Sequence, residues 1–523
     1  MKNHKLTTLL IISFLVLPFL VYPDSEEFMV NEYLEYVMQY KPDTAMSPEG
    51  DFIITWLSGV DGGRGILAKK YDSYVDPYSK EFTVNRDLEL ITTALSIAMN
   101  DLDEYVIVWG CYDGNINQKV VYAKKFPDNG YPVFDVTVQD FPGYPSSAMD
   151  GEGNFVVTYE NKVDSEYGIY AKKYDRECNL MKSFKVSSDS PYNRRSPSVA
   201  MSKNGNFVVT WENYDYEDDI LFRKVSAKLY DQNADPVDEE FLVNTDQSSQ
   251  SKARPAMSDN GDFVIIWLGY SEEDDTSGIY AQLYDAEGNM KGIEFLACKY
   301  IGFPMNDPAI AMDSIGDFVV AWTSGWDKSD PNSSQDGSYS GIFAKRFDYD
   351  GNAIGDEFQV NTNTYLQQLD PSVAMDSDGD FVITWSSLHF GYTQYGTAYL
   401  QVCAQHYQVN PITREPTIDI RSNGTVFIPD YNLRIFVTVD CRYAGAVDMY
   451  ACTQLSGNFY WYPTWDILPV PTELEDEKFD ETIVEIKLTE DRPVGTYTFY
   501  AAITEHGNPE NVLGFDHVTV SIE

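Results

Sequence analysis

The sequence predicts an all-β protein: a seven-bladed β-propeller whose last blade is closed by an N-terminal strand, followed by an immunoglobulin-like β-sandwich. Three observations carry this prediction. One strand phrase recurs seven times, further strand-like segments accompany each copy, and one extra segment of the fourth kind precedes the first unit. The expected organisation is a signal peptide at 1–23, the propeller at 24–410, a linker at 411–416 and the sandwich at 417–523.

The recurring phrase consists of two aromatic residues that enclose three mostly β-branched residues. The first copy is Phe52-Ile-Ile-Thr-Trp56 and the last is Phe381-Val-Ile-Thr-Trp385. The closing aromatic residues lie 50 to 63 residues apart, at positions 56, 109, 159, 211, 267, 322 and 385. Such regular spacing indicates one structural unit per copy. Because the phrase is apolar on both faces of a strand, both faces must be covered.

Three other segments complete each unit, as the last two units show. A first strand such as Pro371-Ser-Val-Ala-Met375 precedes the phrase across a Gly379-Asp380 turn, which is the chemistry of a tight hairpin. A third strand such as Gly341-Ile-Phe-Ala-Lys-Arg-Phe-Asp348 and a short fourth one such as Glu357-Phe-Gln-Val-Asn361 follow it. Four antiparallel strands stacked radially form a propeller blade. A flat β-solenoid is the alternative, but it would use shorter coils and parallel strands.

The seventh unit decides how the ring closes. After its third strand, Val402–Tyr407, no fourth segment follows before the linker. The missing pattern stands at the other end of the chain, as Glu27-Phe-Met-Val-Asn31. We therefore expect the N-terminus to complete blade seven, which leaves no open sheet edge at the closure.

The wording of the repeat resembles a known family. The phrases Ala-Met-Asp-x-x-Gly-Asp-Phe-Val-Val-x-Trp, Gly-Ile-Tyr-Ala-x-x-Tyr-Asp and Glu-Phe-x-Val-Asn, from Phe28 to about Asn410, resemble repeats of large secreted bacterial proteins. The resemblance implies an extracellular, surface-associated role. It brings no catalytic residues to this chain.

The N-terminus and the charge set the expected compartment and partners. Lys2 and Lys5 precede an apolar run from Leu9 to Val21, the layout of a secretory signal peptide, so we expect a secreted or cell-surface protein. An uncleaved anchor is the alternative, because no small-x-small cleavage pattern follows the run. The net charge of −45 repels phosphate backbones and anionic lipid, which disfavours nucleic acid and membrane surfaces as partners.

The C-terminal part reads as a separate domain. Its strand-like segments are 417–420, 425–428, 434–441, 447–453, 458–462, 482–488, 496–503 and 517–522. The phrase from Pro493 to Ala502 resembles the late strands of bacterial immunoglobulin-like modules. Cys441 and Cys452 lie on consecutive strand-like segments and are the candidate disulfide. The other four cysteines are scattered through the repeats, and we expect buried thiols.

The sequence favours a binding or structural module over an enzyme. No GxSxG, HExxH, P-loop or GxGxxG motif stands in a suitable context. The main hypothesis is therefore a non-catalytic protein that recognises an extracellular glycan or protein. The alternative is a polysaccharide hydrolase or lyase that uses carboxylates on a propeller scaffold.

Acidic loops supply the candidate site. The loops between second and third strands should share one face of the ring, where they would form a negative rim. The ligand-face candidates are Asp215, Asp218, Asp219, Glu273, Asp274, Asp275 and Asp327.

A second candidate site is a turn in unit seven. Asp376, Asp378 and Asp380 alternate as calcium ligands do, and no other cofactor is expected. The sister turns lose one acid each, so a plain hairpin turn is the preferred interpretation of this segment.

Overall fold

The computed structural model shows two compact units, residues 1–410 and 411–523. In the first unit the described residues are 22–23, 27–31, 38–59, 65–78, 80–85, 90–113, 118–127, 134–140, 143–163, 166–189, 193–217, 220–244, 250–271, 276–299, 305–325, 334–390 and 398–409. In the second unit the backbone is described for 417–422, 426–427, 432–440, 447–455, 458–461, 472–474, 478–487, 495–505 and 508–522. The described part of the chain holds no helix with the length and apolarity that a membrane span requires.

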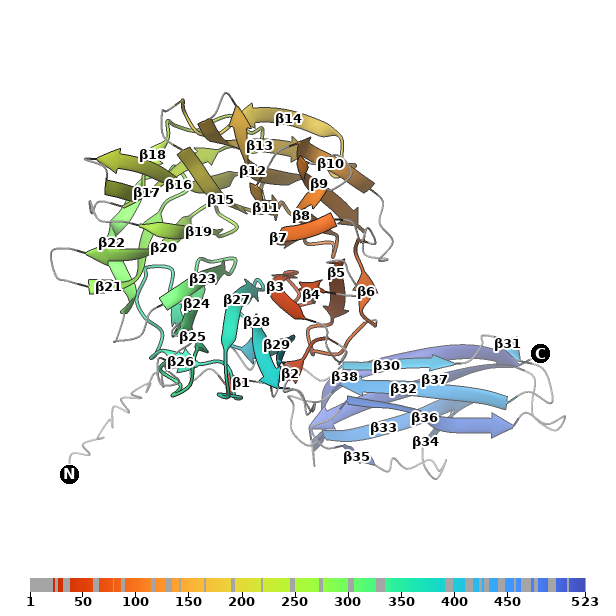
Figure 1. The fold of residues 1–523 in the computed structure, drawn as a ribbon. Helices are drawn as coiled ribbons and strands as arrows, with labels where there is room; N and C mark the ends of the chain where they lie inside the picture. Colours follow the sequence, from red (N-terminus) through yellow and green to blue (C-terminus); the bar gives the residue numbers. More distant parts are fainter. Residues whose placement is uncertain are drawn as a thin grey trace, which may run out of the picture. The chain divides into compact units, whose positions relative to one another are not determined.

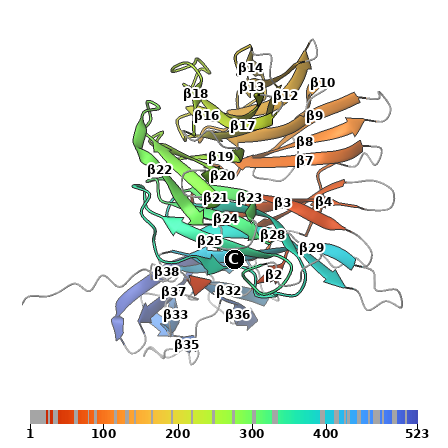
Figure 2. The same ribbon diagram turned by 60° about the vertical axis from the view of Figure 1, so that its left-hand side comes forward.

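The described part of the first unit is a ring of seven antiparallel blades, six of four strands and one of five, which confirms the predicted propeller (Figure 1). Blade one contains β3 (Gln39–Met46), β4 (Phe52–Ser58), β5 (Gly65–Tyr71) and β6 (Phe82–Thr83). Blade two contains β7 (Leu90–Met99), β8 (Tyr105–Asp113), β9 (Gln118–Phe126) and β10 (Phe134–Asp140). Blade three contains β11 (Gly143–Met149), β12 (Phe155–Val163), β13 (Glu166–Tyr174) and β14 (Leu180–Lys185). In Figure 2 the strands β7, β8 and β9 of blade two lie side by side in their sheet.

The remaining blades repeat this order. Blade four contains β15 (Asn193–Met201), β16 (Phe207–Glu217), β17 (Ile220–Tyr230) and β18 (Phe241–Leu242). Blade five contains β19 (Ser251–Met257), β20 (Phe263–Ser271), β21 (Thr276–Tyr284) and β22 (Met290–Lys299). Blade six contains β23 (Met305–Met312), β24 (Phe318–Ser324), β25 (Gly341–Phe347) and β26 (Phe358–Gln359). Blade seven contains β27 (Gln368–Met375), β28 (Phe381–Phe390) and β29 (Ala398–Gln408) from its own part of the sequence.

The N-terminus completes blade seven, as predicted. The short strand β2 (Phe28–Met29) pairs antiparallel with β29, Phe28 opposite Ala404 and Met29 opposite Cys403. The last two residues of the predicted signal peptide, Tyr22–Pro23, form β1, which also pairs with β29.

The core of the propeller lies between blades, as the doubly apolar strands require. The described residues form seven buried clusters, one at each junction between neighbouring blades, including a cluster that joins blade seven to blade one. The phrase-ending tryptophans of blades one, four, five, six and seven are at most 1% exposed. No blade can bury these surfaces alone, so the stability of each depends on its neighbours.

Two aromatic positions of the repeat have defined packing roles. In every blade the first aromatic residue of the phrase stacks on the aromatic residue that ends the third strand, with centroids 4.7–5.0 Å apart and planes within 7–14°. The phenylalanine of the fourth segment instead packs, tilted, against that pair in the next blade. Phe28 contacts Tyr71 in this way at 5.5 Å, as Phe82 contacts Phe126 of blade two at 6.0 Å. Phe28 thus links blade seven to blade one by the same contact with which Phe82 links blade one to blade two.

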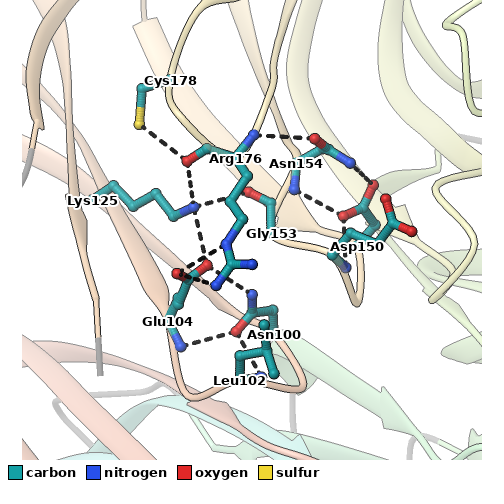
Figure 3. Close-up of polar contacts among 10 residues, drawn as sticks. Asn100, Leu102, Glu104, Lys125, Asp150, Gly153, Asn154, Arg176 and Cys178 are labelled. Atoms are coloured by element: carbon teal, nitrogen blue, oxygen red, sulfur yellow. Dashed lines mark hydrogen bonds and ion pairs between the residues drawn. The ribbon is translucent and has the colours of Figure 1, made fainter. Parts of the chain in front are cut away.

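Buried lysines add polar links between blades. Lys125 of β9 is 2% exposed, and its ammonium donates to the carbonyl oxygens of Gly153 and Arg176 in blade three at 3.1 and 2.8 Å. Its third partner is the carboxylate of Glu104, 3.2 Å away, which also accepts from the Arg176 guanidinium (Figure 3). Lys173, the equivalent residue of blade three, reaches Gly205 and Gln232 of blade four.

The second unit contains two β-sheets. The first sheet contains β30 (Thr417–Ser422), β32 (Asn432–Asp440) and β36 (Lys478–Lys487). The second contains β31 (Val426–Phe427), β33 (Val447–Leu455), β34 (Asn458–Trp461), β35 (Thr472–Leu474), β37 (Gly495–Glu505) and β38 (Asn508–Ile522). All eight segments expected from the sequence correspond to strands, and β35 is an additional one.

Candidate functional site

A cavity of about 640 Å³ occupies the central channel of the propeller. Its walls come from the innermost strand of every blade, β3, β7, β11, β15, β19, β23 and β27, which surround the centre of the ring in Figure 1. Glu212, Tyr214 and Arg223 of blade four add to the lining. A cavity of this volume matches the size range of small-molecule sites.

The inner strands do not run regularly past this cavity. Each of the seven shows a register shift against its partner strand. In six of them a residue other than glycine adopts a positive φ at the shift, and all six line the cavity: Lys41, Tyr144, Ser196, Lys252, Asp307 and Asp370. Such a backbone costs free energy in non-glycine residues, so the surrounding fold must enforce it. The bulges direct these six side chains to the channel.

One residue per blade forms what we name the pore ring. Each pairs with the residue before the closing aromatic of the phrase, and the seven are Asp43, Ser96, Ser146, Ser198, Arg254, Ala309 and Ser372. All of them line the cavity.

Four junctions of the pore ring are tied by the same hydrogen bond. A side-chain oxygen of the ring residue accepts from the backbone N–H of the residue that follows the ring position in the next blade. Ser372 accepts from Thr44 at 3.3 Å, Asp43 from Ile97 at 3.0 Å, Ser96 from Ser147 at 3.0 Å and Ser146 from Val199 at 3.3 Å. Serine at this position is therefore a structural link between blades.

The other three junctions cannot make this bond, for reasons of residue chemistry. Blade five presents Pro255, which has no N–H for Ser198 to accept. Arg254 and Ala309 have no acceptor in their side chains, so they cannot serve the N–H groups of Ile310 and Val373. The channel wall between blades four and seven thus departs from the repeat.

Arg254 is the largest departure. Its guanidinium donates to the carbonyl oxygen of Ala253 at 3.0 Å, and within the described lining it forms no ion pair. Burial lowers the pKa of Arg254, while the charges of Glu212, Asp307 and Asp43 raise it. Arg254 is therefore a half-buried cation that, among the described residues, no carboxylate contacts directly.

The carboxylates around Arg254 have other partners. Asp307 pairs with the ammonium of Lys252 at 2.6 Å. Glu212 accepts from the backbone N–H of Lys252 at 2.9 Å and from the hydroxyl of Tyr214 at 3.0 Å. Asp370 accepts from the hydroxyl of Ser386 at 3.3 Å. Each of these acids thus already has a hydrogen-bond donor within the fold.

Asp43 is tied most firmly. It accepts from the Ser372 hydroxyl at 2.7 Å and from the backbone N–H groups of Ile97 and Thr44 at 3.0 and 3.1 Å. Burial nevertheless raises the pKa of Asp43 to about 6. Both carboxylate oxygens are engaged, so Asp43 holds blades seven, one and two together at the channel wall.

The charge of the channel differs from that of the chain. The lining contains four acids, Asp43, Glu212, Asp307 and Asp370, and four bases, Lys41, Arg223, Lys252 and Arg254. The lining is therefore balanced in charge, although the chain as a whole has a net charge of −45.

The predicted acidic rim falls mostly outside the described residues. This holds for Asp218, Asp219, Glu273, Asp274, Asp275 and Asp327. The sequence predicts a loop at Asp215, but this residue lies within strand β16, where its backbone pairs with Phe222 of β17. The hairpin continues to Glu217 opposite Ile220, because the aromatic and branched residues on both sides favour strand pairing.

The predicted calcium triad lies in a turn whose acids bind backbone groups. Asp376 accepts from the N–H groups of Asp378 and Asp380, both at 2.9 Å, and Asp380 accepts from that of Val409 at 2.9 Å. Asn100 accepts in the same way in the turn of blade two. Among the described residues, no cluster of His, Cys, Asp or Glu is arranged to hold a metal ion.

The cysteines divide as follows. Cys111, Cys178, Cys298 and Cys403 are buried thiols that form no disulfide among the described residues, as expected. Cys441 lies outside the described residues, and its proposed partner Cys452 is in β33. Strands β32 and β33 belong to different sheets, so they are not the cross-strand neighbours that the sequence suggested.

The sequence reasoning missed the pore ring. Arg254 stands three residues before Met257, in the column that Ser198 and Ser372 occupy before Met201 and Met375. Aligning the first strands of the units on this methionine would have revealed it.

Comparisons with known proteins give fold-level similarity only. No protein-family model matches the chain, and no curated protein matches it. A protein of unknown function from Dyadobacter fermentans DSM 18053 is 10% identical, with 74% of this chain and 99% of that one covered and a TM-score of 0.43. A prolyl endopeptidase is 12% identical, with 77% and 54% covered and a TM-score of 0.43. The α-L-arabinofuranosidase Arb93A from Fusarium graminearum is 8% identical, with 73% and 97% covered and a TM-score of 0.37.

Proposed function

We propose that this chain is a secreted or surface-associated binding protein whose propeller holds a polar group of an extracellular glycan in its central channel. The observation that carries the proposal is the cavity of about 640 Å³ with its balanced lining. Hydroxyl-rich ligands are bound by closely spaced donors and acceptors, and the lining supplies both from seven blades. Calcium has no assigned role in this proposal.

The state of the carboxylates favours binding over hydrolysis. Glycosidases need one acid free to protonate the leaving group and another free to attack or to activate water. Asp43, Glu212 and Asp307 instead accept hydrogen bonds or pair with a base of the fold. A hydrolase or lyase remains the second candidate function because of Asp43, since a carboxyl group with a pKa of about 6 suits a general acid.

The proposal also includes secretion of the protein and an immunoglobulin-like fold for the second unit. The apolar N-terminal run supports secretion, and the repeat resembles those of secreted bacterial proteins. The two sheets of residues 417–523 support an immunoglobulin-like sandwich, which would act as a spacer or second contact module.

A binding panel with a channel-filled variant tests the function. The full chain is measured against neutral and acidic oligosaccharides, next to Ala309→Trp, which places an indole in the pore ring, and Ile315→Trp, a control in an exposed turn of the same blade. We expect the control to bind as the natural chain does and Ala309→Trp to lose binding. Equal binding by both variants would place the site outside the channel, and consumption of any oligosaccharide would favour the hydrolase.

A further inference from the structure

We propose that the channel recognises a carboxylate-bearing sugar, a hexuronate unit, and that Arg254 together with the backbone N–H groups of Ile310 and Val373 holds the carboxylate. This inference rests on the proposed function and adds the chemical class of the ligand.

The first argument is the break in the pore ring. In four pore-ring residues, a side-chain oxygen accepts a hydrogen bond from a backbone N–H of the next blade. In blades five and six the pore-ring residues are Arg254 and Ala309, whose side chains contain no acceptor. The equivalent backbone N–H groups of the next blades, those of Ile310 and Val373, therefore receive no side-chain oxygen from the pore ring. Both positions, Ile310 and Val373, line the cavity. An oxygen atom of a ligand can take the place of the missing acceptor.

The second argument is the charge that replaces the serine. The guanidinium of Arg254 is half-buried at the cavity wall and has no ion pair among the described residues, so a bound anion is stabilised there. Arg254 has one hydrogen bond to a carbonyl oxygen, and its remaining N–H donors can form the paired contacts that carboxylates prefer. Donors from a guanidinium and from neighbouring backbone amides together form an anion site.

The neighbouring carboxylates form no ion pair with Arg254, because each of them already has other hydrogen-bond or ion-pair partners. Lys252 pairs with Asp307 and donates its backbone N–H to Glu212, while Ser372 and Ile97 hold Asp43. The acids disfavour a large or multiply charged anion, because four carboxylates line the same cavity. A carboxylate is therefore favoured over a phosphate or sulfate group with more charge.

A sugar is favoured over a peptide terminus by the rest of the lining. The ring of Tyr144 is 59% exposed although it lines the cavity, so one face is available for stacking on a sugar ring. The serines of the pore ring and the carboxylates offer acceptors to several hydroxyl groups.

The test compares matched pairs of probes by calorimetry on the full chain. D-glucuronate and D-galacturonate are measured against D-glucose and D-galactose, which lack only the carboxylate. Trigalacturonate distinguishes a polymer unit from a free sugar acid, and an alanine tripeptide represents a peptide terminus. We expect at least tenfold tighter binding of one sugar acid, or of trigalacturonate, than of the neutral sugars and the tripeptide.

Two variants test which groups of the channel donate to the carboxylate, and a third is a control. Arg254→Ser restores the residue found in four blades and should lower the affinity for the acid at least tenfold without lowering the melting temperature. Ile310→Pro removes one backbone N–H, and Pro255 shows that blade five accepts proline at this place. Lys291→Ser removes a charge from the outer strand of blade five and should leave binding unchanged.

The outcomes separate the inference from the proposed function. Neutral sugars bound as tightly as acids, or an unchanged affinity in Arg254→Ser, would overturn the carboxylate assignment while glycan binding stands. Tighter binding of the tripeptide than of any sugar acid would overturn the assignment of the ligand as a sugar. If no saccharide binds at all, the proposed function itself fails.

Discussion

The backbone N–H of Val402 donates a 2.7 Å hydrogen bond to the side-chain oxygen of Asn31, which stands 371 positions earlier in the chain. Asn85, Asn244 and Asn361 accept the equivalent bond within blades one, four and six, from Ile66, Val225 and Ile342. The asparagine of the fourth segment thus makes the same bond in four blades, and in blade seven it also ties the two ends of the propeller together.

Replacing Asn31 by alanine should weaken the closure. The buried N–H of Val402 would lose its acceptor, at a cost of about 1–3 kcal/mol in the free energy of unfolding. Urea unfolding of the full chain measures the loss. Asn85→Ala removes the same bond within blade one, so it is the matched control for the bond itself. If limited proteolysis cuts near residue 31 no faster in Asn31→Ala than in Asn85→Ala, the special role of the closure is refuted.

Replacing Lys125 by leucine should destabilise the junction of blades two and three. Leu229 and Leu283 occupy the equivalent position in blades four and five, so leucine suits the backbone there. The variant takes the ammonium away from its three partners and leaves Glu104 with only Arg176 and Asn100, which we expect to cost about 1–3 kcal/mol. Lys182→Leu, which breaks the exposed pair with Asp235, should cost under about 1 kcal/mol. Thermal unfolding of both variants decides whether burial of the ammonium matters.

Replacing Asp376 by asparagine should stabilise the protein at alkaline pH. Burial and the charge of Asp380 raise the pKa of Asp376 to about 7. A raised pKa in the folded state means that stability is lost as the pH rises from about 4 through 7. Asparagine can accept the same two N–H groups, as Asn100 does in blade two, without the buried charge.

The expected gain is up to about 4 kcal/mol at pH 8 and close to zero at pH 4, since each pKa unit corresponds to about 1.4 kcal/mol. Melting temperatures at the two pH values measure it. Asp378→Asn, the same change at an exposed position of the turn, should have a smaller effect. A gain of equal size at both pH values would contradict the electrostatic origin.

The four thiols of the propeller should be unreactive in the native state. Burial raises the pKa of Cys178 to about 11 and that of Cys403 to about 12, and it raises the pKa of Cys298 as well. Because the thiolate is the reactive form, alkylation at pH 8 should be slow until the protein is unfolded in urea. Mass spectrometry of each cysteine peptide, before and after unfolding, provides the measurement.

The sequence predicts the ring and its closure well because their signals are local and repeated. The phrase ending in Trp56 or Trp385 is apolar on both faces, and the segment around Asn31 copies a pattern found in other units. Such signals depend on residue type and spacing, which the sequence displays directly.

The channel could not be predicted in the same way. Its lining depends on register shifts in the inner strands, which place Lys252 and Asp307 at positive φ and direct them to one cavity. The partners come from different blades, so no local spacing brings them together. The acidic loops are conspicuous in the sequence because they are rich in charge, whereas Arg254 differs from the serine of other units at a single position of β19.

The bond between Asn31 and Val402 also constrains the order of folding. The chain is made from its N-terminus, so the segment around Phe28 must wait, without its strand partner, until the last propeller strand has been synthesised. Until then the exposed aromatic pair of blade one has no cover, and closing so long a loop carries a large entropic cost. Newly made propellers should therefore pass through an open ring whose two unpaired ends can exchange with those of a second chain.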